Sequence, residues 1–454
     1  MSFRLTVEEV DALTSDNLLL GHSKPGKRKV SGALLTPPSS VGSRSSSSSS
    51  TLSASISIKQ PIAPTIADFD FPQQLDSPEA VEFLGFNPEV AKIIFDDWNQ
   101  ETIKSGLEPD PYVLLEFALG RAQNLNDLSD RPPLIAMRDI GITRHVAEAI
   151  TDPRFTNIFE SESLYFWVED TIKVNLATLV RLQQRLKECA AQIVQVKKGK
   201  GKRSKVETNV AVSAAESSQP TPSQPTITMD TESDNRHLPE PHVAVIVKPT
   251  IHPNHVTLYK GKAPADIDPT EQLIQDDGTL NLISILSRSG GDFNLDRDAW
   301  YFTPEIGTAE QYRLFAATRN KTAETWIIQI QIPETFMNSL KVKSLWFGHD
   351  FKKFVWFNRL RKMKNYPAQF EELLDPAKTD IIRGYCSTGV DKKYSKMSPH
   401  EVQERFTEEN LIWTAGRKAE QVCFTHRGVA NALALQVTGK THIEIHPPIL
   451  SDPE

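Results

Sequence analysis

Two stretches that are poor in large apolar side chains divide this chain of 454 residues. Residues 31–65 are rich in Ser with scattered Pro, and residues 197–240 begin KKGKGKRSK and pass into SAAESSQPTPSQPT. Such segments bury too little apolar surface to offset the conformational entropy lost on ordering. The sequence therefore predicts a mostly disordered tail over 1–65, a helical domain over 66–196, a disordered linker over 197–241 and a second domain over 242–450.

Composition and charge exclude several classes of protein. The chain has no run of eighteen apolar residues, and its start, MSFRLTVEEVDALTSD, carries acids where a signal peptide would have a basic and then an apolar stretch. Cys189, Cys386 and Cys423 are far apart in sequence, so neither a disulfide framework nor a cysteine zinc site is indicated. The net charge of −7 gives no general attraction to nucleic acid. We expect an intracellular protein, in the nucleus or cytoplasm, with no membrane contact and no metal.

Two short basic clusters bear on localisation. KPGKRKV spans 24–30 and KKGKGKRSK spans 197–205, each in or beside a segment predicted to be disordered. An import receptor reads an extended basic peptide of this kind, so nuclear entry is one hypothesis, although such clusters also arise by chance.

The region between the two segments that are poor in apolar side chains has the sequence signals of successive helices. Ser77, Asn87 and Asp110 each precede a Pro, which gives a capping side chain followed by Pro at the first helical position. Along 164–196, apolar side chains recur at heptad spacing, with Asn175 interrupting the pattern: Ile172, Leu179, Leu186 and Ile193, then Leu182, Cys189 and Val196. Two interpretations remain open, a long helix that closes its own bundle and a coiled coil that recruits a protein partner.

After residue 241 the apolar period changes from three-and-four to two. HVAVIVKPT, HVTLYKG, ETWIIQIQIP, TDIIRGYC, EQVCFTH and THIEIHP are short alternating or β-branched runs, and helical stretches such as TAEQYRLFAATR lie between them. This mixture predicts an α+β domain with strands paired over long sequence separations.

The order of these motifs resembles the ADP-ribosyltransferase fold. LYKG at 258–261 comes first, then AWYFT, a helix beginning TAEQYRLFA, WIIQIQIP, TDIIRG and EQVCFTHRGVANALAL. The chain looks most similar to a group of largely fungal proteins that share the GDFN, YFTP, ETWII and KTHIEI stretches. The fold class that the resemblance implies is α+β, with a helical N-terminal domain and a C-terminal split β-sheet domain of the ADP-ribosyltransferase type, joined by the disordered linker.

The resemblance also implies a site for NAD, as the substrate of ADP-ribosyl transfer. Carried over by position, the residue that meets the nicotinamide ribose is Lys260, the aromatic residue is Tyr301 and the catalytic position is Gln421. Transfer passes through an oxocarbenium-like state that a carboxylate stabilises, and Gln brings no negative charge. Glu420 would supply the carboxylate if the strand began one residue out of this register, because a shift of one residue turns a side chain to the other face.

Further candidates for cofactor contact surround these positions. Gly261 follows Lys260, and Ser287 and Ser289 lie in the loop before Gly290 and Gly291, from which a hydroxyl would reach a ribose or phosphate. The alternative role of the Gly pair is a tight turn. Nothing in the spacing matches a P-loop or a GxGxxG motif.

Three functions follow, in decreasing order of preference. The first is binding of NAD or an ADP-ribose-type ligand, with transfer to a macromolecule. The second is a catalytically inactive relative that recruits a protein partner through its helical region or coiled coil. The third is nucleic-acid binding by residues 341–364, where lysines and arginines interleave with Trp346, Phe351, Phe354, Trp356 and Phe357; the competing interpretation of that stretch is an amphipathic helix with solvated cations.

Overall fold

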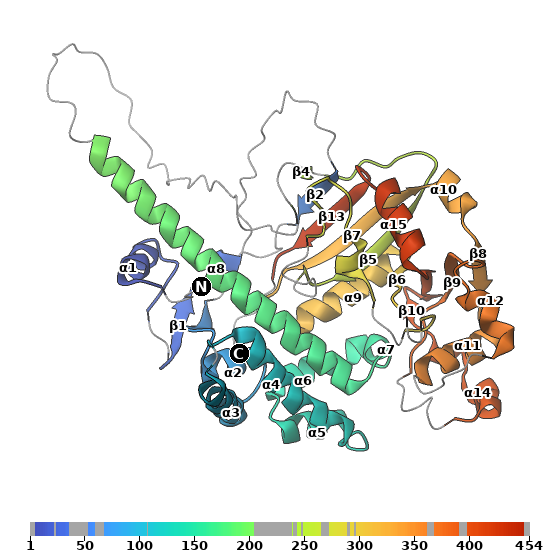
Figure 1. Cartoon of the computed structure of the whole chain (residues 1–454), viewed down its shortest axis with the longest axis horizontal. Helices are drawn as coiled ribbons and strands as arrows, with labels where there is room; N and C mark the ends of the chain where they lie inside the picture. Colours follow the sequence, from blue (N-terminus) through green and yellow to red (C-terminus); the bar gives the residue numbers. More distant parts are fainter. Residues whose placement is uncertain are drawn as a thin grey trace, which may run out of the picture.

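The computed structural model describes the residues that form the folded part of the chain. These are residues 5–21, 24–35, 53–59, 68–106, 108–203, 238, 243–246, 248–264, 272–287, 291–294, 297–360, 367–389 and 397–448. A helical part and a sheet part lie side by side, and the long helix α8 (Leu164–Arg203) runs along the helical part and beyond it (Figure 1).

Capping side chains begin the first helices of the helical part, as the sequence predicts. Ser77 Oγ accepts the Ala80 N–H, Asn87 Oδ1 accepts the Val90 N–H, and Asp110 Oδ1 caps the helix that follows it. Pro at the first position fixes φ where no hydrogen-bond donor is needed. The helices are α2 (Pro78–Phe83), α3 (Pro88–Ser105), α4 (Pro111–Gln123), α5 (Pro133–Ile140), α6 (Arg144–Ile150) and α7 (Thr156–Phe159), with 3-10 turns at Asn124–Asn126 and Pro153–Phe155.

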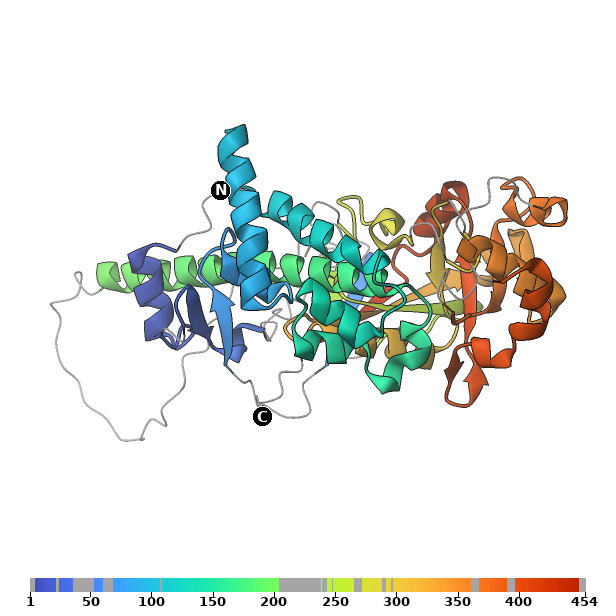
Figure 2. The ribbon, with the colours of Figure 1, turned by 90° about the horizontal axis from the view of Figure 1, so that it is seen from below.

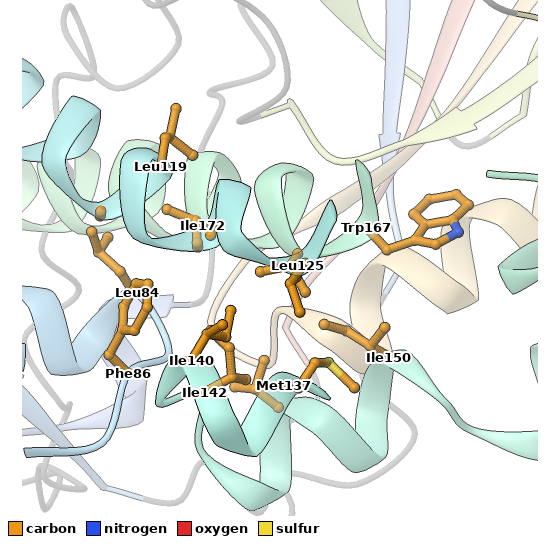
Figure 3. Packing of buried hydrophobic residues seen from close by; sticks show 14 of the residues in the cluster. Leu84, Phe86, Leu119, Leu125, Met137, Ile140, Ile142, Ile150, Trp167 and Ile172 are labelled. Carbon is orange, nitrogen blue, oxygen red and sulfur yellow. The ribbon is translucent and has the colours of Figure 1, made fainter. Parts of the chain in front are cut away.

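One apolar core holds these helices together (Figure 3). Side chains from α2 to α6 point at the N-terminal half of α8, where Trp167 and Ile172 close the cluster. Phe315 belongs to the same core although it lies on α9 (Ile306–Arg319), a helix of the sheet part. The helical part is therefore packed directly against the sheet part.

The heptad positions of α8 are buried within the chain. Leu179, Leu182, Leu186, Cys189 and Ile193 pack against α1 (Val7–Ser15), β1 (Lys27–Val30) and the adjoining 3-10 turn Gly32–Leu35. Asn175 donates its amide to the Leu84 carbonyl, which satisfies a polar group inside the bundle. Of the two interpretations of this helix, the structure has the one in which it closes its own bundle.

The prediction that residues 1–65 are mostly disordered is wrong for several segments. Helix α1 begins at a capping box formed by Thr6 and Glu9, and β1 pairs with β3 (Phe69–Pro72). The basic cluster at 24–30 lies largely in β1, where Lys27 pairs with Glu82, so it is not an extended free peptide. These segments are ordered because α8 offers them an apolar face that their own composition does not reveal.

A further correction concerns β2 (Ala54–Ile58), which lies inside the Ser-rich segment. It is the second strand of a five-stranded sheet with the order β4 (Val243–Val245), β2, β13 (Thr441–His446), β7 (Thr325–Pro333) and β5 (His255–Lys262). Ser55 and Ser57 each lie 3.0 Å from a ring nitrogen of His442. The alternation of Ser with Ala and Ile gives β2 one polar and one apolar face, with Ala54, Ile56 and Ser57 buried and Ser55 and Ile58 partly buried.

A second sheet of four strands lies beside the first. Its order is β6 (Trp300–Phe302), β12 (Glu420–Phe424), β9 (Ile381–Tyr385) and β8 (Val342–Leu345), and a bridge between Tyr259 and Thr303 joins β5 to the end of β6. One face of this sheet shares a core with the first sheet and α15 (Arg427–Gln436). The other face packs on α11 (His349–Leu360).

Short elements complete the sheet part. They are α10 (Glu334–Ser339), α12 (Glu371–Leu374), α14 (Pro399–Arg405), β10 (Trp413–Thr414), β11 (Arg417–Lys418) and the 3-10 turns Leu282–Ile285, Ala368–Phe370 and Glu408–Asn410. The observed fold is α+β, as the change of apolar period predicts. None of the helices in the described ranges is long and apolar enough to span a membrane.

Partly buried ion pairs connect the two parts, so the contact between the parts is polar as well as apolar. Arg319 of α9 pairs with Asp170 of α8 at 2.7 Å and donates to the Thr171 hydroxyl at 2.9 Å. Arg181 of α8 pairs with Glu324 at 3.0 Å. Figure 2 shows α8 passing beside the helical core toward the sheets. The linker predicted over 197–241 is helical up to Arg203, and most of the rest lies outside the described residues.

Candidate functional site

Lys260 lies on β5 and is engaged with the neighbouring strand β6. Its Nζ donates to the Tyr301 carbonyl at 3.2 Å and lies 5.9 Å from the centre of the Phe302 ring. The ammonium therefore supports the junction of the two sheets.

Tyr301 is turned into the molecule, on the face of β6 opposite Trp300 and Phe302. Its hydroxyl donates to Asn294 Oδ1 at 2.9 Å and accepts the Phe293 N–H at 2.8 Å. Burial, with smaller contributions from Cys423 and Asp292, raises the pKa of Tyr301 well above its ordinary value. The phenol is thus neutral, its hydroxyl links β6 to the GDFN loop, and its side chain is partly buried against the core beside α11.

Gln421 and Glu420 point to opposite faces of β12. Gln421 is 7% exposed, and its Nε2 donates to Asp292 Oδ2 and to the Tyr385 carbonyl, both at 2.7 Å. These two bonds use both amide hydrogens. Glu420 has a side chain 30% exposed, and its carboxylate lies 3.3 Å from a guanidinium nitrogen of Arg383.

Asp292 of the GDFN stretch is the centre of a buried polar group, which we call the Asp292 cluster and define by Asp292, Arg359, Ser387, Gln421 and Glu162. Arg359 donates two hydrogen bonds to Asp292 Oδ1, at 3.0 and 2.9 Å. Ser387 donates its N–H to Oδ2 at 2.8 Å and its hydroxyl to Oδ1 at 2.5 Å. The carboxylate therefore has a donor at every accessible lone pair, which offsets the cost of burying it.

The Asp292 cluster also joins the two parts of the molecule. Arg359 of α11 reaches the connection between α7 and α8, where it pairs with Glu162 at 2.9 Å and donates to the Ser161 carbonyl. The side chains of Arg359 and Asp292 are 5% and 4% exposed. One guanidinium thus bridges a carboxylate from each part, a planar fork that Lys would not reproduce.

Groups beside this cluster are held in their protonated forms. Burial, followed by the negative charge of Asp292, raises the pKa of the Cys386 thiol well above its ordinary value, and burial raises that of Cys423 to about 12. Burial is also the main cause that raises the pKa of Tyr312 above its ordinary value. Because the thiolate is the reactive form, neither cysteine is an activated nucleophile at neutral pH.

The glycine and serine candidates serve the backbone. A Cβ on Gly261 would lie 1.9 Å from the Ala309 carbonyl oxygen, so this Gly allows α9 to pack on β5. A Cβ on Gly291 would lie 2.5 Å from Asn294 Oδ1, within the turn that positions Asp292. Ser287 pairs with Ala299 through two backbone hydrogen bonds. Ser289 and Gly290 lie outside the described residues.

A small cavity lies next to the GDFN loop. It is lined by Phe293, Asn294, Arg297, Leu373, Leu374 and Thr425, and its volume is about 10 Å³. That is room for about one water molecule. It cannot hold a nicotinamide or an adenine ring.

The described part of the stretch at 341–364 comprises strand β8, a turn with the exposed Trp346, and the amphipathic helix α11. Phe351, Phe354, Trp356 and Phe357 are at most 4% exposed. Lys343 pairs with Glu372, and Lys352 and Lys353 donate to oxygens of Gln403 and Gln369. Residues 361–366 lie outside the described ranges.

Sequence reasoning missed a partly exposed cluster, which we call the three-ring seat and define by Phe347, Tyr385, Trp413, Lys418 and Glu408. The Lys418 ammonium lies 5.7, 5.5 and 5.8 Å from the centres of the Phe347, Tyr385 and Trp413 rings. Glu408 Oε1 pairs with it at 2.6 Å. Three segments that are far apart in sequence supply the rings, so no local sequence motif predicts the cluster.

A tryptophan that is not one of the three rings flanks the seat. Trp346 contacts Tyr385 at 5.0 Å between ring centres, and Arg383 lies 5.9 Å from its ring. Trp346 and Trp413 are each 39% exposed. Trp and Arg are enriched at the energetic centres of protein interfaces.

The comparisons with known proteins leave the family open. No protein-family model matches this chain, and neither a curated protein nor a solved structure is significantly similar to it. Within the described residues, no group of three or more His, Cys, Asp or Glu side chains is arranged to hold a metal ion.

Proposed function

We propose that this chain is a non-catalytic interaction protein whose sheet part has the architecture of an ADP-ribosyltransferase without the activity. The supporting observation is that the three positions of the expected NAD site are engaged internally. Lys260 bonds the Tyr301 carbonyl, Tyr301 bonds the GDFN loop, and Gln421 bonds Asp292.

The chemistry of these groups supports the same conclusion. A transferase requires a carboxylate that meets the developing positive charge of the ribose. At position 421 the side chain is an amide whose two hydrogens are used, and Glu420 is paired with Arg383 on the other face of the strand. Rebuilding an NAD site would break the Asp292 cluster, and this would leave buried charges without partners.

Titration of the full chain with NAD by calorimetry tests the proposal. We expect no heat of binding at millimolar NAD and no incorporation of labelled ADP-ribose into the protein or into added acceptor proteins. Binding that Tyr301→Ala abolishes, while a folding measurement shows that this variant is native, would overturn the proposal and restore the transferase hypothesis.

A further inference from the structure

The geometry of the three-ring seat indicates what kind of cation it fits. A cation is attracted to a ring face when it lies within about 6 Å of the ring centre. The Lys418 ammonium lies at 5.5 to 5.8 Å from all three centres, near the outer limit of this range. By comparison, Lys352 approaches the Phe347 ring to 5.0 Å. The primary ammonium therefore fills the seat loosely.

Methyl groups on the nitrogen would remove this slack. A methyl carbon stands about 1.5 Å from its nitrogen, as any carbon does on a single C–N bond. A methyl directed at each ring would then lie roughly 4 Å from each ring centre, which is the contact distance of packed carbon atoms. The size of the seat thus suits a methylated ammonium better than the one that occupies it.

Lys418 can leave the seat without disturbing the fold. Its ammonium ends a flexible four-carbon stem, and its carboxylate partner Glu408 is 53% exposed. The Lys418 side chain itself is 22% exposed, and an ion pair whose carboxylate is open to solvent in this way contributes about 0–1 kcal/mol. The backbone of the hairpin is anchored independently, because Ile412 and Ala419 on either side are buried.

We propose that the three-ring seat binds a methylated lysine side chain of a peptide partner, with Lys418 as the group that this side chain displaces. The inference rests on the proposed function, because it names the partner of an interaction protein. Exposed Trp413 gives the incoming side chain access, and Glu408 supplies the negative charge that becomes available when Lys418 leaves.

Charge at the rim favours a peptide over a lipid headgroup as the source of the cation. Glu408 and Glu409 are both exposed beside the seat and would attract basic residues that flank a methylated lysine. The same carboxylates would repel an anionic membrane surface.

The test is calorimetry of the full chain with three probes: a short peptide with one trimethyl-lysine between two arginines, the same peptide with unmodified lysine, and choline. We expect the methylated peptide to bind more tightly than the other two. Lys418→Ala should strengthen its binding roughly fivefold, because the internal competitor is gone. Trp413→Ala should abolish binding, whereas Tyr112→Ala, which removes a 44% exposed aromatic side chain on α4, outside the seat, should leave it unchanged.

Each other outcome overturns the inference. The Lys418→Ala variant has no internal competitor, so it should bind the methylated peptide at a peptide concentration of about 10 mM, well above a millimolar dissociation constant. If it does not bind, the three rings serve only to hold Lys418. Equal binding of the two peptides would exclude recognition of methylation, and equal binding of choline would exclude a peptide partner. The NAD titration on the same sample separates the two proposals, since NAD binding alone overturns the proposed function.

Discussion

The Asp292 cluster and the three-ring seat each hold one cation, and they differ in its partners and its exposure: Arg359 lies between two carboxylates, whereas Lys418 lies among three aromatic rings and one carboxylate. Arg359 is 4% exposed and makes hydrogen bonds to both carboxylates and to a carbonyl, whereas the Lys418 side chain is 22% exposed and has one carboxylate. A buried charge with every partner in place cannot exchange any of them cheaply. An exposed ammonium can be replaced, so the seat is suited to binding and the cluster to holding the fold.

The largest effect should come from removing the carboxylate of the Asp292 cluster. Asp292→Ala leaves Arg359 with Glu162 as its remaining carboxylate and removes the acceptor of Gln421 and Ser387, so we expect a loss of about 3–5 kcal/mol in the free energy of unfolding. Urea denaturation measures it. Glu420→Gln, which breaks a half-exposed pair with Arg383, is the control and should cost less than about 1 kcal/mol. Equal losses of unfolding free energy in the two variants would contradict the distinction between buried and exposed charges.

The close approach of α9 to β5 gives a second large effect. Gly261→Ala would force Cβ against the Ala309 carbonyl, and we expect about 3 kcal/mol of destabilisation in denaturant unfolding. Gly120→Ala lies on α4 with no atom within 4 Å of the added Cβ and should instead stabilise by about 0.5–1 kcal/mol. A tolerated Gly261→Ala would argue that this Gly serves a ligand rather than packing.

A single buried hydroxyl should have an intermediate effect. Tyr301→Phe leaves the Phe293 N–H without its acceptor and removes one of the two donors to Asn294 Oδ1, at a cost of about 1–3 kcal/mol. Tyr112→Phe, at a residue 44% exposed, should change stability by less than about 0.5 kcal/mol. A thermal melt of both variants checks the difference, and a neutral Tyr301→Phe would mean that its hydroxyl is kept for something other than structure.

Glu444 on β13 lies between the two extremes of exposure. Hydrogen bonds from His446 and then Lys59 lower its pKa from 4.5 to about 2. The carboxylate therefore stabilises the fold above pH 4.5, and this contribution, on the order of 1 kcal/mol, is lost as the pH falls toward 2. The difference in unfolding free energy between the wild type and Glu444→Gln should shrink from pH 7 to pH 3. If the difference in unfolding free energy stayed constant with pH, the substitution would act through packing and not through the charge of Glu444.

The smallest change in stability is expected at the seat itself. Lys418→Ala removes one exposed ion pair and three weak ring contacts, so the free energy of unfolding should fall by less than about 1 kcal/mol. Chemical denaturation monitored by tryptophan fluorescence measures it. A loss comparable to that of Asp292→Ala would show that Lys418 is structural and cannot give way to a partner.

Local signals made much of the helical part predictable. The caps at Ser77, Asn87 and Asp110 depend on a side chain and a backbone N–H two or three residues away, and all three form. The change from helical to alternating apolar period likewise marks where most of the strands begin. Such features need no knowledge of the remote chain.

Contacts between distant segments account for what the sequence did not predict. ASISI at 54–58 has a weak strand signal by itself and forms a strand because β4 and β13 pair with it on either side. Tyr301 lies between two buried aromatic residues on a strand with both faces covered. The local sequence therefore does not reveal on which face of the sheet its hydroxyl finds a hydrogen-bond partner. The three-ring seat combines Phe347, Tyr385 and Trp413, and their convergence exists only in the fold.

The parallel pairing of β2 with β13 can form only late in synthesis of the chain on the ribosome. Ser55 and His442 contact each other across 387 positions of sequence, so at about 5–20 residues per second the early strand waits roughly 20 to 80 s for its partner to be made. During that interval β2 has no β13 to pair with, and the five-stranded sheet closes only after translation of its last strand. Assembly of the five-stranded sheet is consequently a late event in the folding of this chain.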